Sequence, residues 1–118
     1  MDIDTAKKHF LLMKEFSETN ERLIIKHIKF ANIVEHEFDS GFGKYLFDRI
    51  PIEKVKDADN DMDRIESIKS EMSKLADSVE DNLKDIEERA NIFLNIAKNL
   101  ELFFDSVFDY YEEYNNIE

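Results

Sequence analysis

The three histidines of this sequence are candidates for metal binding or acid–base chemistry. His9, His27 and His36 are spread over the first third of the chain, and none has a Glu three positions before it. The Glu-x-x-His pairs of carboxylate-bridged di-iron bundles are therefore missing. The sequence also lacks a His-Glu-x-x-His motif, a glycine-rich phosphate loop and a nucleophile elbow. We therefore expect no catalytic residue and no enzymatic activity.

Residues 57–63 are rich in Asp and resemble the beginning of a calcium-binding loop. Such a loop requires Gly at its sixth position and Glu at its twelfth. Counting from either Asp57 or Asp59, neither position holds the required residue. We therefore expect an acidic loop that caps the following helix, with no bound metal and no cofactor.

The composition indicates a chain made of helices. It contains two Gly, one Pro and no Cys, and 42% of its residues are apolar while 37% are charged. A chain with so few turn residues cannot make the many turns of a sheet, and without Cys it has neither a disulfide nor a thiolate zinc site. We predict an all-α fold and a single domain over residues 1–118.

The location of the protein is predicted from what the sequence does not contain. Its first residues are acidic and carry no apolar signal core. No apolar run approaches the ~20 residues that cross a bilayer. We therefore expect a soluble, cytoplasmic protein that does not contact a membrane.

The first third of the chain predicts one helix over about residues 5–38, with Asp4 as its N-cap. Two apolar stripes run side by side along this helix. The first stripe consists of Ala6, Phe10, Met13, Phe16, Ile24, Ile28, Ala31, Val34 and Phe38, and the second of Leu12, Leu23, Phe30 and Ile33. Two adjacent stripes form a broad apolar face, which predicts contact with more than one neighbour. Gly41 is expected to end the helix in a left-handed conformation.

A connector with a short amphipathic turn is predicted over residues 39–60. The second helix begins either at Pro51 or at about Asp61, since both positions carry helix-start signals. From Met62 to Tyr114 apolar residues recur every three or four positions, with a mean step of about 3.5 and no breaker. We predict one acidic helix over about residues 60–114, or 61–114, that packs with the first as a long hairpin with coiled-coil-like packing.

The two predicted helices differ in length. At 1.5 Å per residue, the first spans about 50 Å and the second about 80 Å. Residues 92–114 would be left uncovered, and this aromatic segment would expose more apolar surface than monomers tolerate. We therefore expect a homodimer, a four-helix bundle, with this segment at its interface. The expected interface residues are Phe93, Ile96, Leu100, Phe103, Phe104, Val107, Phe108 and Tyr111.

The net charge of −12 lies entirely in the second half of the chain. Residues 1–56 contain 10 acidic and 10 basic side chains, whereas residues 57–118 contain 18 and 6. Such a surface repels nucleic acid and attracts basic proteins. We expect the following acids to face a partner: Glu101, Asp105, Asp109, Glu112 and Glu113.

The leading hypothesis for function is a protein–protein interaction module, acting as a dimeric adaptor or scaffold. The alternative is an acidic inhibitor that mimics nucleic acid, such as a phage-type anti-defence protein, and occupies a basic groove of its target. The chain itself is not expected to bind nucleic acid directly.

A third hypothesis comes from a resemblance in architecture. Two helices joined by a short Gly-containing turn resemble the Trp-x-Gly class of type VII secretion substrates and their helical partners. Residues 41–43 read Gly-Phe-Gly where that class has Trp-x-Gly, and residues 114–118 match its C-terminal Tyr-x-x-x-Asp/Glu signal. The predicted second helix is longer than in that class. The resemblance implies a helical hairpin that pairs with another helical protein.

Overall fold

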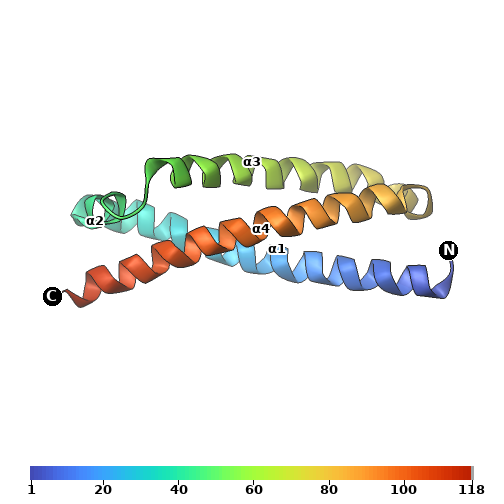
Figure 1. Ribbon diagram of the computed structural model, residues 1–118, viewed down its shortest axis with the longest axis horizontal. Coiled ribbons are helices and arrows are strands. Elements are labelled where there is room, and N and C mark those ends of the chain that lie inside the picture. The colour runs from blue at the N-terminus through green and yellow to red at the C-terminus, as the bar shows by residue number, and fades with distance from the viewer. Residues whose placement is uncertain (118) are drawn as a thin grey trace.

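Three long helices lie side by side in the computed structural model, which describes residues 1–117 (Figure 1). They are α1 (Ile3–Glu37), α3 (Ile52–Leu75) and α4 (Val79–Asn116), in a molecule that measures 59 × 22 × 20 Å. α1 and α4 run in the same direction, and α3 runs in the opposite one. The prediction of an all-helical fold is confirmed for the described residues.

The first helix is capped by Asp2, so the prediction of Asp4 as the N-cap was wrong. Oδ1 of Asp2 accepts a hydrogen bond of 2.7 Å from the backbone N–H of Thr5, three residues later. This bond lowers the pKa of the Asp2 carboxyl. Asp4 lies in the first turn, where its negative charge favours the positive end of the helix dipole.

The first helix ends at a left-handed glycine, as predicted. The 3-10 turn η1 (Phe38–Ser40) leads into Gly41, whose φ is +109°. A Cβ atom at this position would lie 2.6 Å from the hydroxyl oxygen of Tyr114, which donates a hydrogen bond of 2.8 Å to the carbonyl of Ser40. Both the backbone conformation and the close packing of Tyr114 therefore require glycine here.

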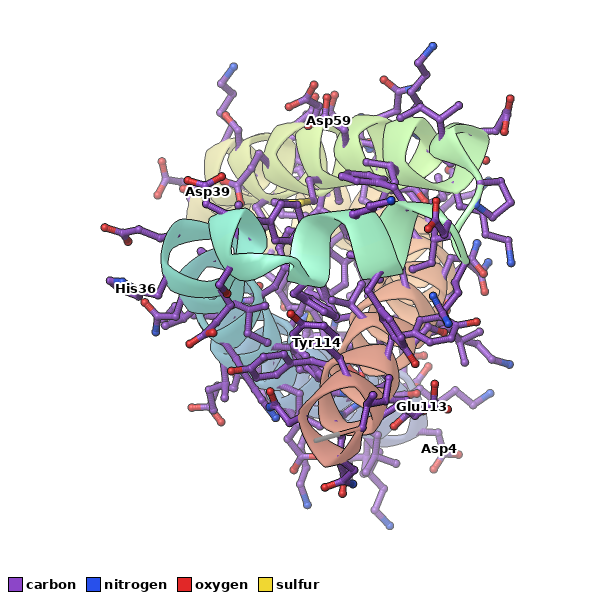
Figure 2. The ribbon with its side chains drawn as sticks, turned by 90° about the vertical axis from the view of Figure 1, so that its left-hand side faces the viewer. Asp4, His36, Asp39, Asp59, Glu113 and Tyr114 are labelled. Carbon is purple, nitrogen blue, oxygen red and sulfur yellow. The ribbon has the colours of Figure 1, made fainter. Side chains whose placement is uncertain are left out.

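The predicted amphipathic turn of the connector is the short helix α2 (Phe42–Phe47). Phe42, Leu46 and Ile50 are buried and cover one end of the bundle. Figure 2 views this end, with Tyr114 lying beneath α2. The connector therefore belongs to the core of the molecule.

The third helix begins at Ile52, directly after Pro51, which is the earlier of the two predicted starting points. Pro51 has φ −60° and ψ 143°, an extended conformation that leads into the helix. Residues 57–63 consequently lie inside α3. The expectation that they form an acidic capping loop was wrong.

The predicted single helix over residues 60–114 is divided by a 3-10 turn, η2 (Ala76–Ser78). Long helices do pack as a hairpin, but the hairpin is formed by α3 and α4 themselves. The guanidinium of Arg89 pairs across it with the carboxylate of Glu71 at 2.8 Å. At the turn, Ser78 leaves the helical conformation, with φ −139° and ψ 71°.

The regular spacing from Met62 to Tyr114 did not reveal this turn, because two helices joined by a short turn can keep the spacing of one helix. The repeat specifies which residues share a face and not whether the backbone reverses. The turn contains neither Gly nor Pro, and a side chain stabilises it: Nδ2 of Asn82 donates a hydrogen bond of 3.2 Å to the carbonyl of Leu75.

The fourth helix contacts both α1 and α3, and residues of all three helices form one core. Phe93, Leu100 and Phe104 are 0–1% exposed. The ring centroid of Phe16 lies 4.3 Å from that of Phe93, and the ring centroid of Phe30 lies 5.2 Å from that of Phe104. α1 therefore runs beside residues 92–114 of its own chain, and the mismatch in helix length that predicted a dimer does not occur.

None of the helices in residues 1–117 combines the length and apolar character needed to cross a membrane.

Candidate functional site

The eight residues predicted to form an oligomer interface pack inside a single chain. Phe93, Ile96, Leu100, Phe104 and Val107 are buried. The other three, Phe103, Phe108 and Tyr111, are partly buried against the core. These residues hold α4 against α1, α2 and α3, so their aromatic character is explained by the core of one chain.

Two of the five predicted partner-facing acids are engaged within the chain. Oε2 of Glu101 accepts a hydrogen bond of 2.9 Å from the ammonium of Lys26, and Oε1 lies 3.4 Å from the guanidinium of Arg22. The ammonium of Lys26 also donates a bond of 3.2 Å to Asp105. Partial burial lowers the pKa of Lys26, but the bonds to Glu101 and Asp105 outweigh this effect and raise it. This cluster joins α1 to α4.

The other three predicted acids remain at the surface. Asp109 and Glu112 are exposed, and the carboxylate of Glu113 accepts a hydrogen bond of 3.3 Å from the hydroxyl of Tyr45. Figure 2 shows Glu113, Asp39 and Asp59 at the periphery of the bundle. The exposed acids are therefore distributed around the bundle and belong to several helices.

The histidines lie far apart. His9 is 8% exposed, and its Nδ1 has no hydrogen-bond partner among residues 1–117. The ring of His27 stacks on that of Phe104, with 5.9 Å between centroids. His36 lies at the surface beside Glu35. Within residues 1–117, no group of three or more His, Cys, Asp or Glu side chains could hold a metal ion.

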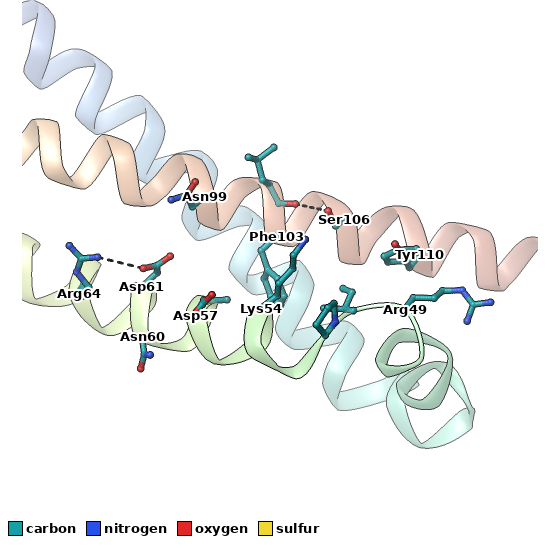
Figure 3. Close-up of a pocket in the computed structure, with 14 residues that line it drawn as sticks. Arg49, Lys54, Asp57, Asn60, Asp61, Arg64, Asn99, Phe103, Ser106 and Tyr110 are labelled. Atoms are coloured by element: carbon teal, nitrogen blue, oxygen red, sulfur yellow. Dashed lines mark hydrogen bonds and ion pairs between the residues drawn. The ribbon is translucent and has the colours of Figure 1, made fainter.

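A cleft of about 660 Å³ lies between the N-terminal half of α3 and α4 (Figure 3). Arg49, Lys54 and Arg64 line it together with Asp57 and Asp61. The carboxylate of Asp61 lies 3.8 Å from the guanidinium of Arg64, and burial raises the pKa of this carboxyl. Charges of both signs thus share the cleft, and its lining offers no nucleophile held by a base.

The outer face of α1 is the strongest candidate for a functional site, because large apolar side chains are exposed along it. We call six of these residues the outer stripe. Their exposed fractions are 80% for Ile3, 72% for Phe10, 65% for Leu11, 44% for Ile24, 67% for Ile25 and 57% for Ile28. Isolated exposed apolar residues are normal, but a row of six on one helix is a feature of interaction surfaces.

Helical spacing places these residues on one side of α1. Ile3, Phe10 and Ile24 are separated by seven and fourteen residues, which correspond to nearly whole numbers of turns. Ile28 lies one turn after Ile24. Leu11 and Ile25, also fourteen residues apart, form the flank of the stripe.

The outer stripe corrects one prediction about the core. Phe10, Ile24 and Ile28 belong to the first of the two predicted apolar stripes, yet they are exposed, whereas Leu23 and Ile33 of the second stripe are buried. The sequence predicted a broad face that meets more than one neighbour. In the chain itself α4, α3 and α2 lie against parts of that face, and the outer stripe is left exposed.

A shallow hollow of about 460 Å³ adjoins the C-terminal end of the outer stripe. It lies between α1 and the end of α4 and is lined by Ile25, Ile28, Asn32, His36 and Tyr111, among others. The middle of the stripe is polar instead, with Lys14, Ser17, Glu18 and Glu21. The ammonium of Lys14 lies 4.0 Å from the carboxylate of Glu18, and both side chains are exposed.

Sequence reasoning did not find the outer stripe as a site, although its signal was present. Leu11 and Ile25 fall outside both predicted stripes, at positions where a helix covered on one face would carry polar residues. Large apolar residues on three sides of a helix indicate burial all round. The neighbours of α1 in this chain leave the side that carries Leu11 and Ile25 exposed.

Comparison of the chain with protein-family models, with curated proteins and with solved structures found no match.

Proposed function

We propose that this protein is a non-enzymatic helical interaction module, and that it binds another polypeptide chain through the outer stripe of α1. The observation that carries the proposal is the exposure of six large apolar side chains on one helix of a chain in which 37% of residues are charged. Such a patch exposes on the order of several hundred Å², as interaction surfaces do.

The energetic reason for binding is the removal of this surface from water. Burial of apolar surface contributes about 25 cal/mol per Å². A partner that covers the outer stripe with an apolar helix face or groove therefore gains a favourable term large enough to offset much of the entropy lost on association. The polar residues at the middle of the stripe add specificity, because their charges must be matched.

The alternative hypotheses have less support. Mimicry of nucleic acid needs a continuous acidic surface, and Glu101 and Asp105 are occupied by cations of α1. The resemblance to the type VII secretion class rests partly on Glu118, which lies outside the described residues. Its other part, the glycine turn, is explained here by the packing of Tyr114 at Gly41.

Site-specific photocrosslinking in the cells that make the protein tests the proposal. A photoreactive amino acid replaces Ser17, which lies within the outer face of α1, and in a matched control it replaces Asn99, an exposed residue of α4. Both sites are solvent-exposed and polar, so neither change disturbs the core.

We expect crosslinked chains at position 17 and few or none at position 99. The crosslinked chain is then identified by mass spectrometry. The absence of any crosslink at position 17, in a protein that is folded and expressed, would contradict the proposal. Equal crosslinking at both positions would also contradict it, because the contact would then not be specific to α1.

A further inference from the structure

We infer that the outer stripe binds a second copy of this chain, with the two α1 helices antiparallel about a twofold axis near residues 18–19. This inference rests on the proposed function and names its partner. Three features carry it: the symmetry of the stripe, the hollow at one end of it and the charges at its middle.

Four residues of the outer stripe form two pairs, Phe10 with Ile28 and Leu11 with Ile25, that are arranged symmetrically about residues 18–19. One apolar cluster, with Phe10 and Leu11, lies near one end, and a second, with Ile24, Ile25 and Ile28, lies near the other. A twofold axis near residues 18–19 brings Phe10 of each copy opposite Ile28 of the other. The same axis brings Leu11 opposite Ile25. A surface that matches itself in this way is what a twofold interface requires.

The hollow beside the C-terminal cluster provides a place for an aromatic side chain. Phe10 is 72% exposed, which makes it a projecting group at the other end of the stripe. Antiparallel pairing moves the Phe10 ring toward the hollow lined by Ile25, Ile28 and Tyr111 of the second copy. Because of the symmetry, this insertion occurs twice in each dimer.

Charges at the middle of the stripe fit the same arrangement. Lys14 and Glu21 lie on opposite sides of the axis, so Lys14 of each copy approaches Glu21 of the other. Within one chain these two residues are seven positions apart, about two turns, and are too distant to pair. In its own chain the ammonium of Lys14 lies 4.0 Å from the carboxylate of Glu18, and both side chains are exposed.

The area of the stripe also fits a dimer of moderate affinity. A standard interface buries about 800 Å² on each partner, and the exposed outer stripe with its polar middle is on the order of this size. α1 is 35 residues long, so it offers about 50 Å of helix to the second copy. A dimer can form through α1 without any rearrangement of the core residues of α4 or of the α3–α4 hairpin.

Sedimentation velocity over a dilution series tests the inference directly. We expect the wild-type chain of 14.0 kDa to pass reversibly from monomer to dimer as its concentration rises. Phe10→Asp removes the projecting group and introduces a charge, and should weaken dimerisation at least about a hundredfold. Leu102→Asp is the matched control, since Leu102 is 59% exposed but lies on α4. It should leave the dimer unchanged.

Charge-reversal variants test whether the two α1 helices of the dimer are antiparallel. Lys14→Glu and Glu21→Lys should each weaken the dimer by roughly fivefold, because each puts like charges together twice. The double variant Lys14→Glu/Glu21→Lys should restore wild-type affinity. A parallel pairing would place each residue opposite its own copy. Each single reversal would then only exchange one like-charged pair for another, so neither single variant would weaken the dimer. Circular dichroism confirms that each variant is folded.

A wild-type chain that stays monomeric into the millimolar range would overturn the inference. An equal loss of dimer in Phe10→Asp and Leu102→Asp would overturn it as well. Failure of the double variant to recover would overturn the antiparallel arrangement. If the chain is monomeric and position 17 nevertheless crosslinks to a different protein, this inference fails while the proposed function stands.

Discussion

Phe10 and Phe104 are identical side chains with opposite surroundings. Phe10 is 72% exposed on the outer face of α1, whereas Phe104 is 1% exposed between α1 and α3 and contacts the rings of Phe30 and His27. The sequence placed Phe104 at an interface between chains and Phe10 in a core stripe. The structure buries Phe104 in the core of one chain and exposes Phe10, and residues 60–114, predicted as one helix, are divided between α3 and α4.

The same substitution at these two sites should have very different effects on stability. Phe104→Ala leaves a cavity in the core and should lower the free energy of unfolding by about 3–5 kcal/mol. Phe10→Ala should change it by less than about 0.5 kcal/mol in the monomer, because the ring is in water. Urea unfolding at a dilution where the chain is monomeric measures both. A large loss in Phe10→Ala would show that Phe10 packs within the chain.

A second prediction at the residue scale concerns the carboxyl of Asp61. Burial raises its pKa, Arg64 opposes this effect, and the nearby Asp57 adds to it. The charged form is therefore less favourable in the folded chain than in the unfolded one. Asp61→Asn should stabilise the protein at pH 7, by up to roughly 0.5 kcal/mol.

The difference in stability between Asp61→Asn and the wild type should depend on pH, because the pKa of Asp61 is raised in the folded chain. As the pH falls through the raised folded-state pKa, the wild-type carboxyl takes up its proton and the penalty disappears. The advantage of Asp61→Asn should therefore shrink with falling pH and vanish below the ordinary value of 3.8. Asp63→Asn, at an exposed site of the same helix, is the control and should show no comparable trend in urea unfolding. A growing advantage at acid pH would contradict the assignment.

At the scale of helices, the turn between α3 and α4 decides the architecture. It consists of Ala76, Asp77 and Ser78, none of which prevents a helix from continuing. The hydrogen bond from Asn82 to the carbonyl of Leu75 is a local contact that favours reversal. Such a contact is formed only after the chain has turned, which explains why the apolar repeat alone predicted one continuous helix.

Asn82→Ala should therefore destabilise the hairpin although alanine is the better helix former. We expect a loss of about 1 kcal/mol in the free energy of unfolding. Asn91→Ala makes the same exchange at an exposed position of α4 and should be neutral or slightly stabilising. The comparison by thermal unfolding separates the turn contact from helix propensity. Equal behaviour of the two variants would show that the bond to Leu75 does not hold the turn.

The turn before α2 is the part of the fold that the sequence predicted best. Gly41 was expected to be left-handed, and its φ is +109°. Its second constraint was not visible in the sequence, because Tyr114 lies 73 residues later and reaches Gly41 only in the folded chain. The start of α3 after Pro51 was one of two alternatives, since Pro51 and the Asp-rich residues after it both carry start signals.

A pair of variants tests both constraints at Gly41. Gly41→Ala should lower the free energy of unfolding by about 1 kcal/mol or more, because alanine strains the backbone and its Cβ meets the hydroxyl of Tyr114. In the Tyr114→Phe background the hydroxyl is gone, so the same substitution should cost less, although the strain in φ remains. Urea unfolding of the four chains gives the coupling. An additive result would show that Tyr114 does not press on this turn.

At the scale of the whole molecule, α1, α3 and α4 enclose one core, and one side of α1 is exposed. Composition and periodicity predicted an all-helical chain, the first helix, the glycine turn and most of the buried residues of α4, but not the division of residues 60–114 into two helices. They did not predict which face of α1 stays bare, since that depends on where α3 and α4 lie. The turn at Ala76–Ser78 places α3 against α4, and this arrangement leaves the outer stripe exposed.

The central claim is that the outer stripe of α1 is the surface through which this protein binds. Hydroxyl-radical footprinting of the full chain, read residue by residue by mass spectrometry, tests it most directly. Phe10, Leu11 and Ile25 should react strongly in dilute protein and become protected in the assembled state, while Leu102 and Ile52 stay equally reactive in both. Protection of Leu102 or Ile52, with Phe10 and Ile25 unchanged, would place the binding surface elsewhere and contradict the claim.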